Sequence, residues 1–237
     1  MIKAVLFDLD GTLLPMDQDV FVATYFKRLA MAVGHLGYEP KPLQDAVWKG
    51  TGAMVMNDGS RLNSDAFWDC FNKIFGRDTR VDEPAFDEFY RTEFNKVKEV
   101  CGFQPMSREV VEYLLDAGFR TALATNPIFP AIATRNRMNW AGLDPEMFEL
   151  FTSYENIGYC KPNPKYYQEV IDRMGLKPEE CLMVGNDVGE DMGPASSLGM
   201  SVFLVTDCMI NKAGEDIEKY PHGGFPELLA YLKQLNA

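Results

Sequence analysis

The sequence predicts an α/β protein in which a doubly wound parallel sheet forms the core and a helical segment is inserted into it. In residues 103–237, short apolar runs that suit buried strands alternate with helix-length segments, which is typical of a parallel sheet with helices on both faces. Residues 15–102 instead show helical periodicity and contain no convincing strand. We therefore assign residues 1–14 and 103–237 to a Rossmann-like core and residues 15–102 to an all-helical cap domain.

The core begins with residues 4–7, Ala-Val-Leu-Phe, a wholly apolar run that suits a strand buried on both faces. Asp8 and Asp10 follow, and then Gly11 and Thr12. Residues i and i+2 of an extended chain point to the same side, so the two carboxylates should converge where the strand ends. Such a pair is costly to bury without a cation, and Mg2+ prefers oxygen ligands. The alternative is that both acids are solvated turn or cap residues.

The cap is predicted to consist of amphipathic helices. We expect them over residues 20–33, 40–49, 64–75 and 82–97. The glycines within residues 50–52 are expected to end the second helix, Ser64 to cap the third, and Pro84 to lie in the first turn of the fourth. We interpret the many Phe and Trp residues of this block as the packing of a small core of its own.

The second part of the core is predicted as alternating helices and strands. We expect strands over residues 119–125, 147–153, 180–185 and 200–205, and helices over residues 107–117, 127–140, 164–174, 190–198 and 225–235. Residues 206–224, punctuated by Gly and Pro, are expected to form an irregular loop.

Polar residues follow the predicted strands at the points where ligands of open α/β sheets bind. Thr125 and Asn126 follow one strand, and Gly-Asn-Asp at residues 185–187 follows another, with Asp191 four residues later. Lys161 lies in a Cys-Lys-Pro-Asn-Pro loop before a helix. Because the strand ends meet at one edge of a parallel sheet, these acids, the hydroxyl, the amide and the lysine form a convergent set.

Each of these side chains also has a purely structural interpretation. Thr125 alone suits a helix cap, and Asn126 suits the cap of a helix that starts at Pro127. Lys161 alone suits a solvated surface position. Asp191 suits the first turn of a helix, where the helix dipole favours an acid.

The order of these segments resembles the haloacid dehalogenase-like hydrolase superfamily. Its four motifs are matched by Asp-Leu-Asp-Gly-Thr at residues 8–12, Thr-Asn at 125–126, Lys-Pro-Asn-Pro at 161–164 and Gly-Asn-Asp with a later Asp at 185–191. The predicted cap lies between the first two motifs, as does the helical cap of phosphatases in this family. The resemblance covers nearly the whole chain and implies a Mg2+-dependent phosphatase that hydrolyses a small phosphomonoester.

The resemblance also implies a role for each matched residue. Asp8 would attack phosphorus and form an aspartyl-phosphate intermediate, and Asp10 would protonate the leaving oxygen and later activate water. Lys161 would offset the charge of the nucleophile and the phosphate. The transferring phosphoryl oxygens would be bound by Thr125 and by backbone N–H groups near Leu9 and Asn126.

In the family, Mg2+ is bound by the first carboxylate, the backbone carbonyl of the second and an acid of the last motif. Here these are Asp8, Asp10 and Asp187, with Asp191 as a direct or water-mediated ligand. The last motif often begins Gly-Asp, whereas this chain has Gly-Asn-Asp, so Asn186 is the alternative to Asp187. We prefer Asp187 because an anionic oxygen binds Mg2+ better than a neutral amide.

Other functions stay open at this point. A phosphomutase of the same family also keeps the second acid, Asp10, which the family's dehalogenases lack. A non-enzymatic receiver module also uses a strand-end Asp with Mg2+, although it needs only about 120 residues and no large helical insertion. Since the cap of this family contributes to substrate selection, Arg61 is a candidate to bind a second anionic group. A solvated surface arginine is the alternative.

Composition narrows the class of partner. The net charge of −12 disfavours a nucleic-acid-binding surface. The resemblance implies a small phosphorylated metabolite as partner, and we expect a monomer or homodimer. The five cysteines are scattered without a Cys-x-x-Cys pair, which indicates reduced thiols and a cytoplasmic location. No apolar run approaches the ~18 residues of a membrane span, and we expect no signal peptide.

Overall fold

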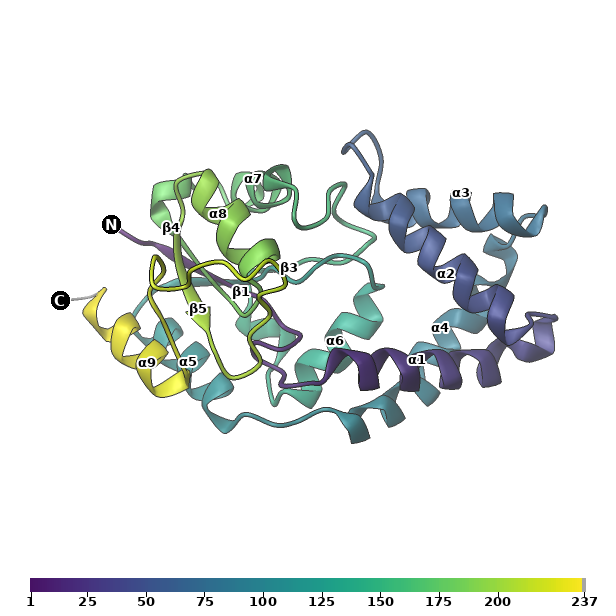
Figure 1. The fold of residues 1–237 in the computed structure, drawn as a ribbon, viewed down its shortest axis with the longest axis horizontal. Coiled ribbons are helices and arrows are strands. Elements are labelled where there is room, and N and C mark those ends of the chain that lie inside the picture. Colours follow the sequence, from purple (N-terminus) through teal and green to yellow (C-terminus); the bar gives the residue numbers. More distant parts are fainter. Residues whose placement is uncertain (236–237) are drawn as a thin grey trace.

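The computed structural model describes residues 1–235, which form an α/β part and, beside it, a helical part (Figure 1). The α/β part contains a six-stranded sheet in the order β3-β2-β1-β4-β5-β6, and every strand pair is parallel. The predicted parallel α/β fold is thereby confirmed. The strands are β1 (Ala4–Phe7), β2 (Arg120–Leu123), β3 (Leu150–Phe151), β4 (Cys181–Gly185), β5 (Ser201–Val205) and β6 (His222–Gly223).

Both faces of the sheet are buried, which explains why β1 is apolar throughout. Val5 and Phe7 belong to one apolar cluster and Ala4 and Leu6 to a second cluster, because successive side chains of a strand point to opposite faces. The first cluster includes residues of α5 (Pro105–Asp116), α6 (Ala131–Trp140) and α9 (Phe225–Gln234), and the second includes residues of α7 (Pro164–Arg173) and α8 (Gly193–Ser197).

The helical part lies between β1 and α5 in the sequence. Its helices are α1 (Gln18–Val33), α2 (Pro40–Val55), α3 (Asn63–Phe75) and α4 (Glu83–Arg91), followed by a 3-10 segment over residues 93–100. Pro15 and Gly102 lie side by side where the chain enters and leaves this part, and the Gly102 N–H donates to the Pro15 carbonyl at 2.7 Å. The division into two domains at these points stays a prediction. No helix within residues 1–235 is both long and apolar enough to cross a membrane.

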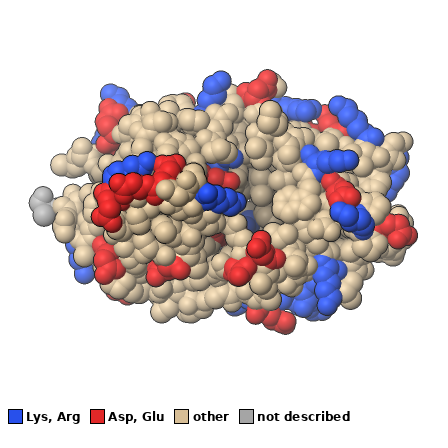
Figure 2. Space-filling model, in the orientation of Figure 1, with Lys and Arg blue, Asp and Glu red and all other residues tan. Residues whose placement is uncertain are grey.

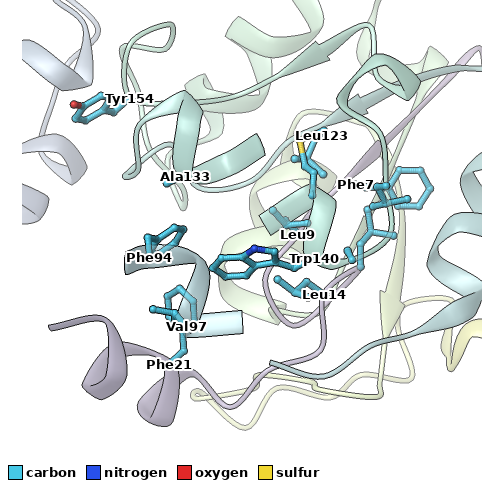
Figure 3. Packing of buried hydrophobic residues seen from close by; sticks show 14 of the residues in the cluster. Phe7, Leu9, Leu14, Phe21, Phe94, Val97, Leu123, Ala133, Trp140 and Tyr154 are labelled. Atoms are coloured by element: carbon cyan, nitrogen blue, oxygen red, sulfur yellow. The ribbon is translucent and has the colours of Figure 1, made fainter. Parts of the chain in front are cut away.

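The predicted separate core of the cap was wrong. One apolar cluster runs from the sheet through α6 into the helical part. Figure 3 shows Trp140 of α6 with Leu9 and Leu14 on one side and Phe94 and Val97 of the 3-10 segment on the other. The rings of Trp140 and Phe94 have their centroids 4.9 Å apart. The helical part is therefore packed onto the α/β part through shared aromatic residues.

The predicted end of the second helix was also wrong, since α2 continues through Gly50 and Gly52 to Val55. A side chain at Gly50 would place its Cβ 2.6 Å from the ring of Phe67 on α3. Gly50 therefore serves the close approach of α2 and α3 and does not end a helix.

Other helix and strand boundaries differ from the predicted ones, because contacts with distant parts of the chain outweigh the local sequence preferences. Ser64 does not cap α3, which starts at Asn63, and the N–H groups of Asn63 and Ser64 donate to the carbonyls of Ile157 and Tyr154 in the α/β part. The helix predicted over residues 127–140 starts only at Ala131, after Pro130 in extended conformation. The strand predicted over residues 147–153 is reduced to β3, and the loop predicted over residues 206–224 contains β6.

Candidate active site

The candidate site starts at the carboxyl end of β1, where the chain makes a tight turn. The Asp8 N–H still donates to the Val184 carbonyl of β4 at 2.9 Å, and the Leu9 carbonyl then accepts from Thr12 and Leu14. Gly11 allows this turn because it has a φ of 87°, and a Cβ there would lie 2.3 Å from the Asn186 amide. The turn thus places Asp8 and Asp10 beside the end of β4.

Lys161 joins the first motif to the last one. Its side chain is 1% exposed, and its ammonium donates to Asp8 Oδ1 at 2.8 Å and to Asp191 Oδ1 at 2.6 Å. Burial alone would lower the pKa of Lys161, but the carboxylates of Asp191 and Asp8 hold that pKa well above its usual value. Asp191 also accepts from the Tyr167 hydroxyl and the Asp187 N–H. Asp191 therefore orients Lys161 toward Asp8.

Asn186 is linked to Asp8 through the Thr12 hydroxyl, and the Asp187 side chain has other partners. The Thr12 hydroxyl is 3.1 Å from Asp8 Oδ2 and 3.0 Å from Asn186 Oδ1, and the Asn186 amide donates to the Cys208 carbonyl at 2.7 Å. The Asp187 carboxylate accepts instead from the N–H groups of Gly189 and Glu190 at 2.8 and 3.0 Å. It thus caps the helical turn that follows β4.

Asp10 is bound by an arginine that sequence reasoning missed. Arg137 of α6 is fully buried and forms an ion pair with Asp10 Oδ2, while Asp10 Oδ1 is buried without a hydrogen-bond partner in the described part of the chain. The Arg137 guanidinium also packs over the ring of Phe129, 4.5 Å from its centroid. Burial raises the pKa of Asp10, and Arg137 opposes that rise. One signal of this role was present, because Arg137 lies on the stripe of α6 that also buries Ala133.

Thr125 and its neighbours follow β2, the strand beside β1, at the same edge of the sheet as Asp8. Thr125 is buried beside the cavity, and its carbonyl accepts from the hydroxyls of Thr152 and Tyr166. The backbone N–H groups of Leu9 and Asn126 are not used in backbone hydrogen bonds within residues 1–235. They are therefore suitable donors to a ligand at this edge of the sheet.

Asn126 has a partner that the sequence did not indicate. Its amide donates to Glu190 Oε2 at 3.1 Å, and burial raises the pKa of Glu190. The alternative of a cap at the start of a helix was wrong for Asn126, because α6 begins only at Ala131.

One end of a cavity of about 360 Å³ between the α/β part and the helical part is lined by Asp8, Asp10, Thr125, Asn126, Asn186, Asp187, Glu190 and Asp191. Figure 2 shows a hollow between the two parts, with tan residues on its helical side. Aromatic side chains from all four helices α1–α4 face this cavity, among them Tyr25, Trp48, Trp68 and Tyr90. Arg61 is not among the lining residues, and its guanidinium pairs with Asp69 at 2.6 Å.

Comparison with known proteins identifies the family. The sequence matches the model of the haloacid dehalogenase-like hydrolases over residues 2–199. The chain belongs to this family. Among relatives of this hydrolase, a glyceraldehyde 3-phosphate phosphatase from Methanothermobacter thermautotrophicus is 29% identical over 222 residues, with 92% of each chain covered. A phosphoglycolate phosphatase from Vibrio vulnificus is 28% identical over 206 residues, with 86% of this chain and 84% of the relative covered.

Solved structures share the fold of this haloacid dehalogenase-like hydrolase. A HAD phosphatase from Thermococcus onnurineus aligns with a TM-score of 0.59 at 22% identity and covers 98% of each chain. An L-2-haloacid dehalogenase from Xanthobacter autotrophicus aligns with a TM-score of 0.58 at 20% identity, covering 98% of this chain and 99% of the other. The resemblance inferred from the four motifs is therefore confirmed at the level of family and fold.

The donor set of this hydrolase fits a hard divalent cation. The cavity around Asp8 is lined by the carboxylates of Asp187, Glu190 and Asp191 and by the Asn186 amide, all oxygen donors of the kind that Mg2+ binds. In the described chain, no three His, Cys, Asp or Glu side chains are grouped closely enough to hold a metal by themselves. A bound Mg2+ would therefore also need backbone carbonyl or water ligands, which that ion commonly keeps.

Proposed function

We propose that this hydrolase is a Mg2+-dependent phosphatase that acts on a small phosphomonoester through an aspartyl-phosphate on Asp8. The observation that carries this proposal is the pair of carboxylates held by two different cations, Asp8 by Lys161 and Asp10 by Arg137. An acid fixed at the floor of a cavity suits a nucleophile, and a second acid held apart from it suits proton transfer. The phosphatases among its relatives support the same reaction class.

In the first step, an oxygen of Asp8 forms a bond to phosphorus while the bond from phosphorus to the ester oxygen breaks. The leaving oxygen takes a proton from Asp10, and Oδ1 is the atom suited to carry it because Oδ2 is bound by Arg137. In the second step, water attacks phosphorus and returns a proton to Asp10 Oδ1. The bond from Asp8 to phosphorus then breaks and releases inorganic phosphate.

The surrounding residues hold the phosphoryl group during both steps. Lys161 offsets the charge of Asp8, and the Thr125 hydroxyl with the N–H groups of Leu9 and Asn126 would bind the phosphoryl oxygens. Mg2+ would be held by Asp8, the Asp10 carbonyl and Asp187, and would supply electrostatic stabilisation of the phosphoryl charge. We assign Asp191 an indirect role at the metal, because its carboxylate already binds Lys161, Tyr167 and the Asp187 N–H.

Phosphate release from a panel of phosphomonoesters, measured with and without Mg2+, tests this function. The wild type should release phosphate only with Mg2+, and Asp8→Asn should abolish release while its circular dichroism spectrum stays native. Asp116→Asn, at the exposed end of α5, provides a control that should keep wild-type activity.

Three results would contradict the proposal. Wild-type activity in Asp8→Asn would exclude the covalent route. Stable phosphorylation of Asp8 without release from any ester would favour a receiver-like module. Transfer of phosphate between positions of a sugar without net release would identify a phosphomutase.

The cytoplasmic location remains a proposal. It is supported by the five cysteines, all of which are free thiols in the structure.

A further inference from the structure

We propose that the substrate of this phosphatase is the phosphate ester of an apolar, uncharged alcohol that carries no second anionic group and few hydroxyls. This inference rests on the proposed phosphatase function and deepens it. It follows from the charge, the apolar character and the hydrogen bonding of the cavity walls.

The cavity has no cation available for a second anionic group. Its lining includes no Lys, Arg or His among residues 1–235, although it includes the acids Asp87 and Glu190. The basic groups nearest to the chemistry are already bound, Lys161 by Asp8 and Asp191 and Arg137 by Asp10. A carboxylate or second phosphate on the substrate would therefore lose its water without gaining a counter-charge, which is unfavourable.

The walls beyond the phosphate end are apolar. Val22 and Phe26 of α1, Val47 and Trp48 of α2, and Phe129 of the α/β part line this region. The rings of Phe26 and Trp48 have their centroids 5.6 Å apart. Burial of an apolar alcohol against these side chains is favoured by the hydrophobic effect, and a cavity of about 360 Å³ is within the usual range of small-ligand sites.

Two hydroxyl groups at the helical end of the lining and that of Thr51 already have partners within the protein. The hydroxyls of Tyr25 and Tyr90 bind each other at 2.9 Å, and the Thr51 hydroxyl donates to the Val47 carbonyl at 2.9 Å. Besides Asp10 Oδ1, two buried polar atoms of the lining have no hydrogen-bond partner within the described chain, the indole N–H of Trp68 and Asn126 Oδ1. One neutral acceptor on the substrate could use the Trp68 N–H and one hydroxyl could donate to Asn126 Oδ1, but the further hydroxyls of a sugar would stay unpaired at a cost.

An uncharged alcohol fits better than a cationic one. Asp87 is the acid at the helical end of the cavity, and Arg91 lies 3.7 Å from its carboxylate. The Arg91 guanidinium offsets part of the negative charge that a cationic substrate would need.

Matched esters test this inference. With Mg2+ present, kcat/KM should be at least about 30-fold higher for 3,3-dimethylbutyl phosphate than for phosphoglycolate, which carries a carboxylate. The same ester should also exceed choline phosphate, its cationic isostere, and glucose 6-phosphate. The inference is overturned if any of these three polar esters is hydrolysed as efficiently as 3,3-dimethylbutyl phosphate.

A variant links this preference to the cavity wall. Trp48 is 47% exposed, so Trp48→Ala is expected to fold. It should lower kcat/KM about fivefold more for 3,3-dimethylbutyl phosphate than for methyl phosphate. Phe103→Ala, at a residue that is 64% exposed and outside the lining, is the control and should change neither value. Equal losses for the two esters in Trp48→Ala would contradict a role of this wall in binding.

A binding measurement separates this inference from the proposed function. Benzylphosphonate and phosphonoacetate cannot be hydrolysed, and calorimetry with Mg2+ should show at least about 30-fold tighter binding of benzylphosphonate. Equal or tighter binding of phosphonoacetate overturns the inference even if esters are hydrolysed. Tighter binding of benzylphosphonate without hydrolysis of any ester supports the inference about the cavity and overturns the phosphatase function alone.

Discussion

Arg137 reaches from α6 to the carboxylate of Asp10 and forms an ion pair with it below the surface of the cavity. Asp8, two residues earlier, is bound by Lys161 from a different loop. The two acids of one turn therefore have different cationic partners, and of these two acids Asp10 alone keeps a buried oxygen that has no hydrogen bond within residues 1–235. This difference supports distinct roles for them in phosphoryl transfer.

Loss of Arg137 should destabilise the fold. Arg137→Met would leave the Asp10 carboxylate without its cation, and we expect the free energy of unfolding to fall by about 3 kcal/mol. Asp10→Asn in the same chain should recover part of that loss, because the uncompensated charge is removed. Urea unfolding measures both effects. Arg135→Met, at an exposed residue of the same helix, should cost less than about 1 kcal/mol, and an equal cost for the two arginines would contradict the assignment.

Replacement of Asp10 should affect poor leaving groups most. Asp10→Asn cannot protonate the leaving oxygen, so we expect hydrolysis of an alkyl phosphate to slow by about 10²–10⁴-fold. An aryl ester such as 4-nitrophenyl phosphate needs less protonation, and its first step should slow far less. Single-turnover measurements of alcohol release compare the two. Equal losses for both esters would show that Asp10 is not the acid.

Asp187 and Asn186 can be distinguished by the Mg2+ requirement. Both residues line the cavity, but Asn186 offers only a neutral amide, bound to Thr12 and the Cys208 carbonyl, whereas Asp187 offers a carboxylate whose Oδ1 accepts two backbone N–H groups. We expect Asp187→Asn to raise the Mg2+ concentration needed for half-maximal activity about tenfold more than Asn186→Ala does. Titration of activity with Mg2+ measures this, and the reverse ranking would assign the first metal-ligand place to Asn186.

The sequence predicted the strand ends well because the chemistry there is local. Asp8 follows β1, Thr125 follows β2, and Lys161 precedes α7. Short sequence motifs are enough to predict these three positions. The role of Arg137 was not predicted, because its partner Asp10 is far away in the sequence. The residues around Arg137 contain no motif that indicates this contact. The aromatic walls of the cavity were interpreted only as core, since periodicity shows which helix face is apolar but not what that face contacts.

The glycines of α2 illustrate the same limit. The sequence pattern predicts a helix end at Gly50 and Gly52, yet both lie within α2, and the surroundings of the two glycines differ. A Cβ at Gly50 would meet the Phe67 ring at 2.6 Å, whereas nothing lies within 4 Å of a Cβ at Gly52. Gly52→Ala should therefore stabilise the protein by about 0.5–1 kcal/mol through helix propensity. Gly50→Ala should destabilise it by about 1–3 kcal/mol through overpacking. Thermal unfolding of the two variants checks this, and stabilisation by both would show that α2 and α3 adjust freely.

The hydroxyl pair of Tyr25 and Tyr90 should make stability fall at high pH. Burial raises the pKa of Tyr25 to about 12 in the folded state, whereas a tyrosine of the unfolded chain has a pKa near 10. Between these two values the Tyr25 hydroxyl keeps its proton in the folded state and loses it in the unfolded chain. This contribution is complete below pH 10 and is lost as the pH rises toward 12. Between pH 9 and pH 11 the free energy of unfolding should therefore fall by about 1 kcal/mol more in the wild type than in Tyr25→Phe. Urea unfolding at the two pH values measures the difference, and an identical fall in both proteins would mean that Tyr25 titrates alike in the folded and unfolded states.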